Sequence, residues 1–233
     1  MMGQPVNSPR AVARLALAAG VLVAPIFYLT VFIQAATREG YSSSRVALSL
    51  LSLGHAGWIQ ITNFIVCGLL ALISVVGFRA VLSGHRGGVW GPLLVAIYGL
   101  GLVIAGVWHP DPGAGFPPGT PLHSTAPMSG HYIVHWIGFI LINISLIASC
   151  FLFAWVFRGL GQRGWSIYGV VSAVVGVILV VAGLATENFL GPTFGGLVIY
   201  SFLSAVAGRI LALAPTASPR PGERRVDRVG LPG

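Results

Sequence analysis

The strongest constraint on the fold of this chain is a set of apolar runs, each about as long as a lipid bilayer is thick. A helix needs about 20 apolar residues to cross the hydrocarbon core of a bilayer. Inside lipid every backbone N–H and C=O must be paired within the protein, and runs of this length therefore favour helices. The sequence predicts six such helices, at roughly 13–35, 58–82, 90–109, 130–157, 166–187 and 193–214.

The predicted fold is all-α, a polytopic membrane protein built as a six-transmembrane-helix bundle. We expect the bundle to occupy residues 13–214. Residues 1–12 are expected to form a cytoplasmic N-terminal segment, and residues 215–233 a disordered, Arg-rich cytoplasmic tail.

The composition agrees with a chain that lies in lipid. Hydrophobic residues make up 55% of the sequence and charged residues only 8%, against about 25% charged residues in soluble domains. The formal net charge is +8, but the arginines fall mainly in short loops and in the tail. We therefore predict the lipid bilayer as a partner and no nucleic-acid partner.

The distribution of arginine predicts the orientation of the helices. Cytoplasmic loops of membrane proteins carry an excess of positive residues. With both termini in the cytoplasm, only Arg38 and Arg45 of the 13 basic residues lie outside, and the opposite orientation would invert this bias. We expect a multi-pass protein of the cell membrane.

The ionisable residues gather at the predicted outer face. His85 alone among the six histidines falls in a cytoplasmic loop, and Asp111 and Glu187 lie at the outer face as well. Ionisable groups near membrane depth are functional candidates. The outer histidines are His55, His109, His123, His131 and His135.

Small residues recur on the same helical faces as these polar groups, and small residues mark the faces where membrane helices pack closely. Several predicted helices therefore direct their polar outer ends toward each other, which predicts a shared polar pocket below the outer surface. The stripes are His131, Gly138, Ser145 and Ser149; Gly169, Gly176 and Gly183, with Glu187 one turn later; Gly99 and Gly106, leading to His109; and Asn63, Cys67 and Ser74.

The predicted pocket is open to two kinds of chemistry. His131 and His135 are four residues apart on a helix, and such a pair can hold a divalent metal such as zinc, with a metal-bound water as nucleophile. Without a metal, a desolvated carboxyl group and a histidine could exchange a proton as general acid and base. The candidate catalytic residues are His109, Asp111, His131, His135 and Glu187. As a third possibility, the same residues only anchor helix ends at the membrane interface.

Two of the predicted outer loops are long enough to carry structure of their own. In segment 36–57, Ser42 to Ser44 are expected to cap a short amphipathic surface helix. Segment 110–128 is dense in proline and glycine, and we expect it to be irregular and stiff. His123 lies in this loop and is expected to be solvated.

The chain also resembles a known family. The stretches ALSLLSLGHAGWIQITNFIVCGLL and GVWHPDPGAGFPPG, followed by a Gly-His start to the next span, are similar to the bacterial membrane family called domain of unknown function 998. The resemblance covers about residues 15 to 212. It implies a six-span fold in the inner or plasma membrane of a bacterium, and no established activity. It also implies that the loop with Asp111 and the start of the His131/His135 helix belong to a shared pattern.

These observations lead to one functional hypothesis and two alternatives. We expect a membrane-embedded enzyme or binding protein that acts on a lipid-like or other hydrophobic small molecule by acid/base chemistry, with or without a metal. The first alternative is a proton- or ion-coupled transporter, which the apolar middle of the spans disfavours. The second is a structural or assembly protein without chemistry.

Overall fold

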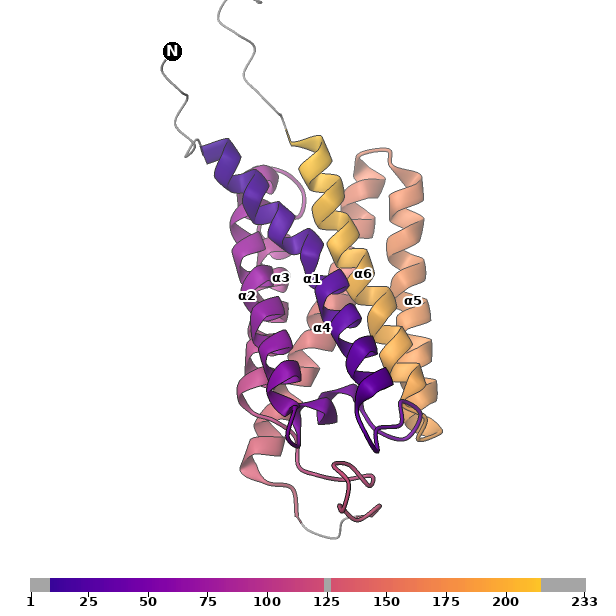
Figure 1. Ribbon diagram of the computed structural model, residues 1–233. Helices are drawn as coiled ribbons and strands as arrows, with labels where there is room; N and C mark the ends of the chain where they lie inside the picture. Colours follow the sequence, from indigo (N-terminus) through magenta and orange to yellow (C-terminus); the bar gives the residue numbers. More distant parts are fainter. Residues whose placement is uncertain (1–8, 124–126, 215–233) are drawn as a thin grey trace, which may run out of the picture.

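The computed structural model of the protein describes residues 9–123 and 127–214. Within these residues it is all-helical, with six helices long and apolar enough to cross a membrane and no regular strand (Figure 1). The six predicted spans are confirmed, with ends displaced by a few residues. The helices are α1 Pro9–Thr37, α2 Gly57–Leu82, α3 Trp90–Val107, α4 Gly130–Gly159, α5 Arg163–Ala185 and α6 Leu190–Leu213, with a short 3-10 helix, η1, at Leu48–Ser52.

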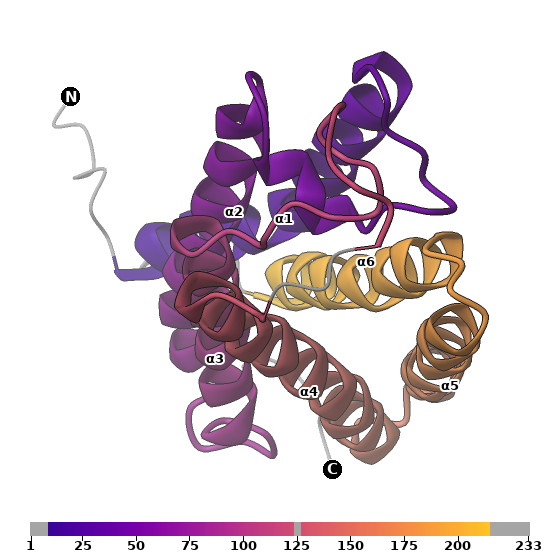
Figure 2. The ribbon, with the colours of Figure 1, turned by 90° about the horizontal axis from the view of Figure 1, so that it is seen from below.

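Consecutive helices are neighbours, and α6 closes the ring by packing against α1. Figure 2 shows α6 flanked by α1 on one side and α5 on the other, with α4 facing it. Helix α6 also touches α2 and α4 and therefore lies toward the centre of the bundle.

The start of α1 and the end of α6 lie at the same end of the bundle, which we call the terminal end (Figure 1). There Arg14 donates hydrogen bonds from Nη1 to the carbonyls of Leu211 and Ala214, over 3.2 and 3.1 Å. The opposite end carries the long loops 38–56 and 108–129, and we call it the loop-rich end. That the terminal end faces the cytoplasm stays a prediction, and the expected tail 215–233 lies outside the described residues.

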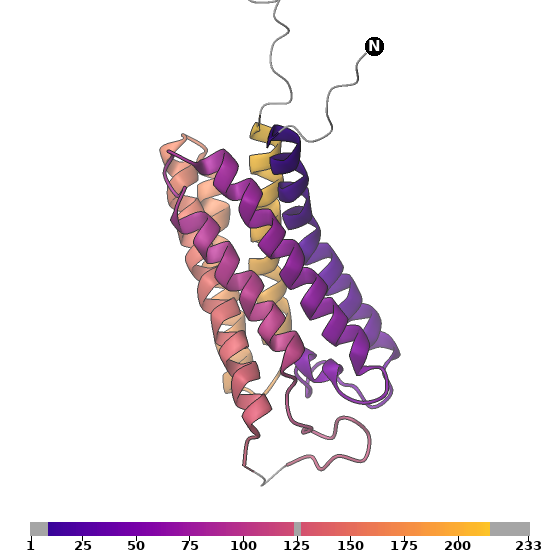
Figure 3. The same cartoon turned by 90° about the vertical axis from the view of Figure 1, so that its left-hand side faces the viewer.

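Helices α2, α3 and α4 run side by side along one flank of the bundle (Figure 3). Pairs of facing glycines hold them together. A Cβ atom on Gly101 would lie 2.9 Å from the carbonyl oxygen of Gly138, and one on Gly138 would lie 2.9 Å from that of Gly101. Gly68 and Gly99 form the same reciprocal pair one interface earlier, at 2.8 and 2.9 Å. Because no side chain separates these backbones, the helices approach more closely than larger residues would allow. We call this region the glycine seam.

The glycines spaced by seven on α5 also face neighbouring helices, as their spacing predicts. Gly169 packs against the backbone of Cys150 on α4, whereas Gly176 and Gly183 pack against the first half of α6. All three are buried. Helix α5 therefore packs against α4 near the terminal end and against α6 near the loop-rich end.

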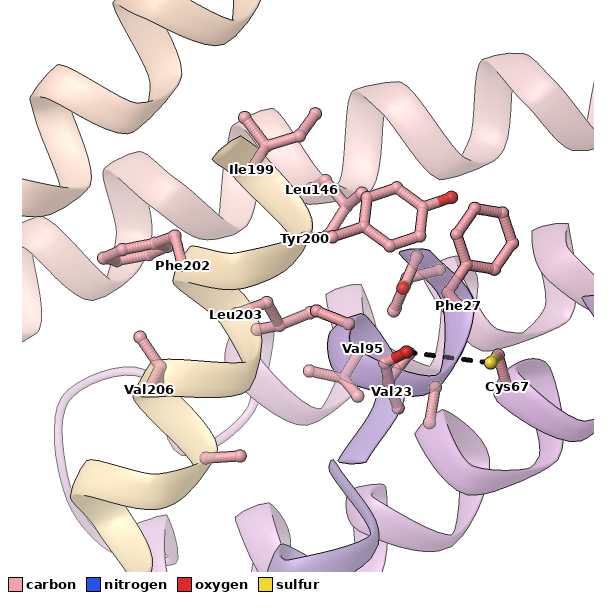
Figure 4. Close-up of a cluster of buried hydrophobic side chains, with 14 of the residues drawn as sticks. Val23, Phe27, Cys67, Val95, Leu146, Ile199, Tyr200, Phe202, Leu203 and Val206 are labelled. Atoms are coloured by element: carbon pink, nitrogen blue, oxygen red, sulfur yellow. Dashed lines mark hydrogen bonds between the residues drawn. The ribbon is translucent and has the colours of Figure 1, made fainter. Parts of the chain in front are cut away.

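Aromatic and aliphatic side chains fill the middle of the bundle (Figure 4). The rings of Phe27 and Tyr200 lie 5.1 Å apart, and Figure 4 shows them side by side. The thiol of Cys67 points to the carbonyl of Val23 at 3.7 Å. Cys67 and Cys150 are both buried as free thiols, which act here as small apolar side chains.

The loop after α1 differs from its prediction. Ser42 to Ser44 do not cap a helix; the chain instead forms the 3-10 helix η1, which begins after Ala47 without a side-chain cap. Leu50, Leu51 and Ser52 of η1 are buried rather than lying on the surface. The physical reason is that η1 turns its leucines into the bundle, where burial of apolar area outweighs a surface position.

The two long loops are joined to each other and to the α5–α6 turn. The guanidinium of Arg38 lies 5.4 Å from the ring centre of Phe116, a buried residue of the second loop. Arg45 donates from Nε to the carbonyl of Ala114 over 3.3 Å. The backbone N–H of Phe189 donates to the carbonyl of Ser44 over 2.8 Å. The described parts of the two loops therefore lie against each other across the loop-rich end, and we call them the loop cover.

Candidate functional site

A cavity of about 730 Å³ lies beneath the loop cover at the loop-rich end. Helices α1, α4 and α6 supply most of its helical lining, and residues 45, 47–50, 111–114 and 127–129 of the loops line it at the loop-rich end. A volume of this size lies within the range of roughly 300–1,000 Å³ that is typical of small-molecule sites.

The floor of the cavity is aromatic. Phe27 and Tyr28 from α1, Phe64 from α2 and Tyr200 from α6 all line it. Their rings meet mostly edge to face, with centres 5.3 Å apart for Phe27 and Phe64 and 5.4 Å apart for Tyr28 and Tyr200. This is the arrangement that aromatic pairs prefer. The floor is therefore a rigid apolar surface that also carries two phenol hydroxyls.

One face of α4 forms a second wall. Counted from Tyr132, its main lining residues fall at positions i, i+3, i+4, i+7 and i+11, which places them on one side of a helix. They combine large apolar surfaces with a few polar groups. From the loop-rich end inward the main ones are Tyr132, His135, Trp136, Phe139 and Asn143.

His135 lies on this wall and is buried, with 4% of its surface exposed. Its Nδ1 lies 3.1 Å from the carbonyl oxygen of Ala105 and 2.8 Å from that of Trp108, at the end of α3. The last carbonyls of a helix have no N–H partner within the helix, and here the imidazole N–H is that partner. Since a carbonyl oxygen only accepts, Nδ1 must carry the proton, and in the neutral ring Nε2 is then an acceptor.

Asp111 lies on the cavity wall where the second loop meets α4. Its carboxylate accepts the hydroxyl of Ser129 at 2.6 Å and the backbone N–H of Ser129 at 2.8 Å. The Ser129 hydroxyl oxygen in turn accepts the backbone N–H of Tyr132 at 3.1 Å and caps α4. These hydrogen bonds from Ser129, with a smaller effect of the nearby histidines, hold the pKa of the Asp111 carboxyl below its usual range.

His109 and His131 come together outside the cavity. Their ring centres are 5.7 Å apart, and both side chains are exposed at the loop-rich end. His131 therefore lies beside His109, two residues before Asp111, while His135, one helical turn later, is buried in the bundle. His55 and His123 are exposed as well, as expected for His123.

The candidate metal pair, His131 and His135, is thus divided between the surface and the cavity wall. Among the residues that the structure describes, no three His, Cys, Asp or Glu side chains are grouped as a metal site would require. A catalytic zinc site needs about three protein ligands. A divalent metal at these two histidines stays a hypothesis without a third ligand to support it.

Glu187 lies on the turn between α5 and α6 and is exposed. Its backbone φ is +54°, the left-handed conformation that ends the helix. The cavity wall includes its neighbour Phe189 but not Glu187 itself. Of the five candidate catalytic residues, the structure therefore brings Asp111 and His135 to the cavity and places His109, His131 and Glu187 around its outside.

Several lining residues were not singled out from the sequence. Arg45 comes from the loop after α1, and the floor uses Phe27, Tyr28 and Tyr200, which by hydropathy look like any other core residue. The α4 wall had a detectable signal in the spacing of its aromatic residues and Asn143. That signal marks a helical face but does not show whether another helix or a cavity covers it.

Comparison with known proteins places the chain in a family. No curated protein and no solved structure matches it. A family model described as "Protein of unknown function (DUF998)" matches residues 21–218, which include most of α1 and all of α2 to α6. With six membrane-spanning helices and a match over most of its length, the chain belongs to the DUF998 family.

Proposed function

We propose that the protein binds a hydrophobic small molecule or lipid in the cavity at the loop-rich end. The observation that carries this proposal is the cavity itself, about 730 Å³ with a largely apolar and aromatic wall and few polar groups. Such a combination is typical of ligand sites, where apolar area supplies affinity and a few polar groups orient the ligand.

Binding can be tested by filling the cavity. Asn143 lies on the cavity wall, and its amide bonds only to the Phe139 carbonyl of its own helix, at 2.8 Å. Asn143→Trp should therefore occupy the ligand's volume at little cost to packing. Ile144, the next residue, is 64% exposed on the outside of α4, so Ile144→Trp is the matched control.

The measurement is native mass spectrometry of the purified protein with farnesol, farnesyl methyl ether and farnesyl phosphate, which share one hydrophobic tail. We expect at least one probe to bind the wild type and Ile144→Trp. Asn143→Trp should weaken its binding on the order of ten-fold or more, because an indole replaces the space that the tail needs. If no probe binds, or if both tryptophan variants bind alike, the proposal fails.

An acid/base enzyme acting on the bound molecule is the second candidate, because Asp111 and His135 both line the cavity. The two candidates differ in what happens to the ligand. If the mass of the recovered ligand changes during incubation with the wild type and stays unchanged with Asn143→Trp, the protein is an enzyme. An unchanged ligand supports a binding protein.

Transport has less support. The aromatic floor of Phe27, Phe64 and Tyr200 closes the cavity toward the terminal end. A carrier needs polar groups and a path at the bilayer midplane. The side chains below this floor are mainly apolar, and the hydroxyls of Ser74, Tyr98 and Ser204 lie singly among them without forming a polar path.

A further inference from the structure

We propose that the ligand of this cavity is a neutral lipid whose polar end is a hydroxyl group, and that this hydroxyl donates a hydrogen bond to Nε2 of His135. The inference rests on the proposed function and adds the chemical class of the ligand. Three features of the cavity lead to it: the orientation of one imidazole, the charge of the wall, and the hydroxyls of the floor.

The imidazole of His135 is held in one tautomer. Two backbone carbonyls of the α3 end share Nδ1, at 3.1 and 2.8 Å, and the edge of the ring meets Phe64 with centres 6.3 Å apart. The ring is therefore oriented before any ligand arrives, with Nε2 as a lone-pair acceptor. Nε2 has no hydrogen-bond partner within the described residues. A ligand that complements it must present an O–H or N–H group.

The charge of the wall excludes strongly anionic head groups. Among the described residues that line the cavity, the charged side chains are Arg45 and Asp111, one of each sign. The positive charge of Arg45 is thus balanced on the wall by the carboxylate of Asp111, which accepts two hydrogen bonds from Ser129. A phosphate or diphosphate is normally held by several cationic or backbone donors. The wall instead suits a neutral molecule.

The floor adds two hydroxyl groups to the polar groups of the cavity. Tyr28 and Tyr200 line the cavity, and their hydroxyls make no hydrogen bond to the described residues. The wall thus presents an acceptor at His135 and phenolic donors at the floor. A carbonyl ligand could use only the phenolic donors, and an ammonium, which only donates, would leave those donors unpaired. An alcohol both donates and accepts, and it carries no charge.

The test compares the three farnesyl probes on the wild-type protein. Farnesol has the hydroxyl donor, farnesyl methyl ether keeps the oxygen but lacks the donor, and farnesyl phosphate carries negative charge. We expect farnesol to bind on the order of ten-fold more tightly than the ether, because the ether leaves the acceptor at His135 unpaired. Farnesyl phosphate should bind more weakly than farnesol.

The substitution His135→Asn tests whether His135 accepts the hydrogen bond from the ligand hydroxyl. The asparagine amide can reach the α3 carbonyls as Nδ1 does, but it has no group at the position of Nε2. Farnesol should then bind only as well as the ether, while ether binding stays as in the wild type. His131→Asn, one turn earlier on the exposed side of α4, is the matched control and should keep the ten-fold preference.

The outcomes separate the two proposals. If none of the probes binds, the proposed function itself is overturned. If the probes bind but the ether or the phosphate equals or exceeds farnesol, the cavity is a hydrophobic site and the hydroxyl assignment is overturned. A farnesol preference that survives in His135→Asn overturns the role of His135. Should His135→Asn fail to fold, the comparison of the three probes on the wild type still decides the ligand class, and His135→Gln tests the residue. The Gln amide reaches the position of Nε2 and supplies an acceptor oxygen, so it should keep part of the preference.

Discussion

The two sides of α4 differ in how they pack: one is in direct contact with α3, and the other lines the cavity. On one side Gly138 packs directly on the backbone of α3 in the glycine seam. On the other side Trp136 and Phe139 face the cavity, across which lies α6. Small residues let backbones meet and leave no space between them, whereas large residues hold a neighbouring helix at a distance. The cavity therefore depends on the seam, which fixes α4 in place.

The largest effect is expected from breaking the seam. In Gly138→Ala the added Cβ would lie 2.9 Å from the Gly101 carbonyl oxygen and 3.0 Å from the Ala105 nitrogen, both backbone atoms that cannot move alone. We expect the free energy of unfolding to fall by about 1–3 kcal/mol. Thermal unfolding in detergent measures this loss, and ligand binding should weaken in parallel.

Gly164→Ala is the control for this substitution. Gly164 lies in the first turn of α5, and a Cβ there would meet no atom within 4 Å. The same change should stabilise the protein by about 0.4–1 kcal/mol, because alanine restricts the unfolded chain. Equal effects of the two substitutions would show that the seam is not the close contact that the structure indicates.

A smaller effect is expected where the loop cover joins the cavity wall. Ser129→Ala removes the cap of α4 and a hydrogen bond to Asp111 at once, and we expect a loss of about 1–2 kcal/mol. Since Asp111 acts through Ser129, the loss in the Ser129→Ala/Asp111→Ala double variant should be less than the sum of the two single losses. Additive losses in thermal unfolding would mean that the two side chains act independently.

The same pair predicts a dependence of stability on pH. Ser129 lowers the pKa of Asp111 in the folded state, so the folded protein favours the ionised carboxyl more than the unfolded chain does. The stabilisation is present above the unfolded pKa of about 3.9 and is lost as the pH falls through the lower folded pKa. In Ser129→Ala this acid-dependent loss should become smaller. Thermal unfolding between neutral and acidic pH tests it, and an unchanged profile would contradict the assignment.

The smallest effect is expected from the exposed histidine pair outside the cavity. His109→Ala and His131→Ala should each change stability by less than about 0.5 kcal/mol, since both side chains are exposed. Metal analysis after dialysis should show no bound zinc in the wild type or in either variant, because two imidazoles without a third ligand hold zinc weakly. Stoichiometric zinc that is lost in His131→Ala would restore the metal hypothesis.

The sequence predicted the bundle well because the signals for spans are local. Residues 90–109 were expected to span, and α3 runs over Trp90–Val107. Gly169, Gly176 and Gly183 were expected on a packed face and are buried. Length and hydropathy decide a span, and spacing by seven decides a face, without knowledge of the neighbouring helix.

The candidate site was harder to predict because its residues come from distant parts of the chain. His131 and His135 share a helical face by spacing, yet His131 lies beyond the last turn of α3 and reaches the surface, while His135 meets the carbonyls of Ala105 and Trp108. Glu187 follows the glycine stripe of α5, but the helix ends before it and turns it outward. The spacing of residues along one helix predicts which face they share, but it does not predict where that helix or its neighbour ends.

By itself, the sequence determined that this protein is a membrane-spanning bundle of six helices, which faces of those helices pack, and that ionisable groups gather at one end. Only the tertiary structure decided that Asp111 and His135 line a cavity while the other candidate residues stay outside it. The physical reason is that the apolar length of a span and the spacing of its small residues are local properties of the sequence. A cavity, in contrast, is the volume that remains after six helices and two loops have packed.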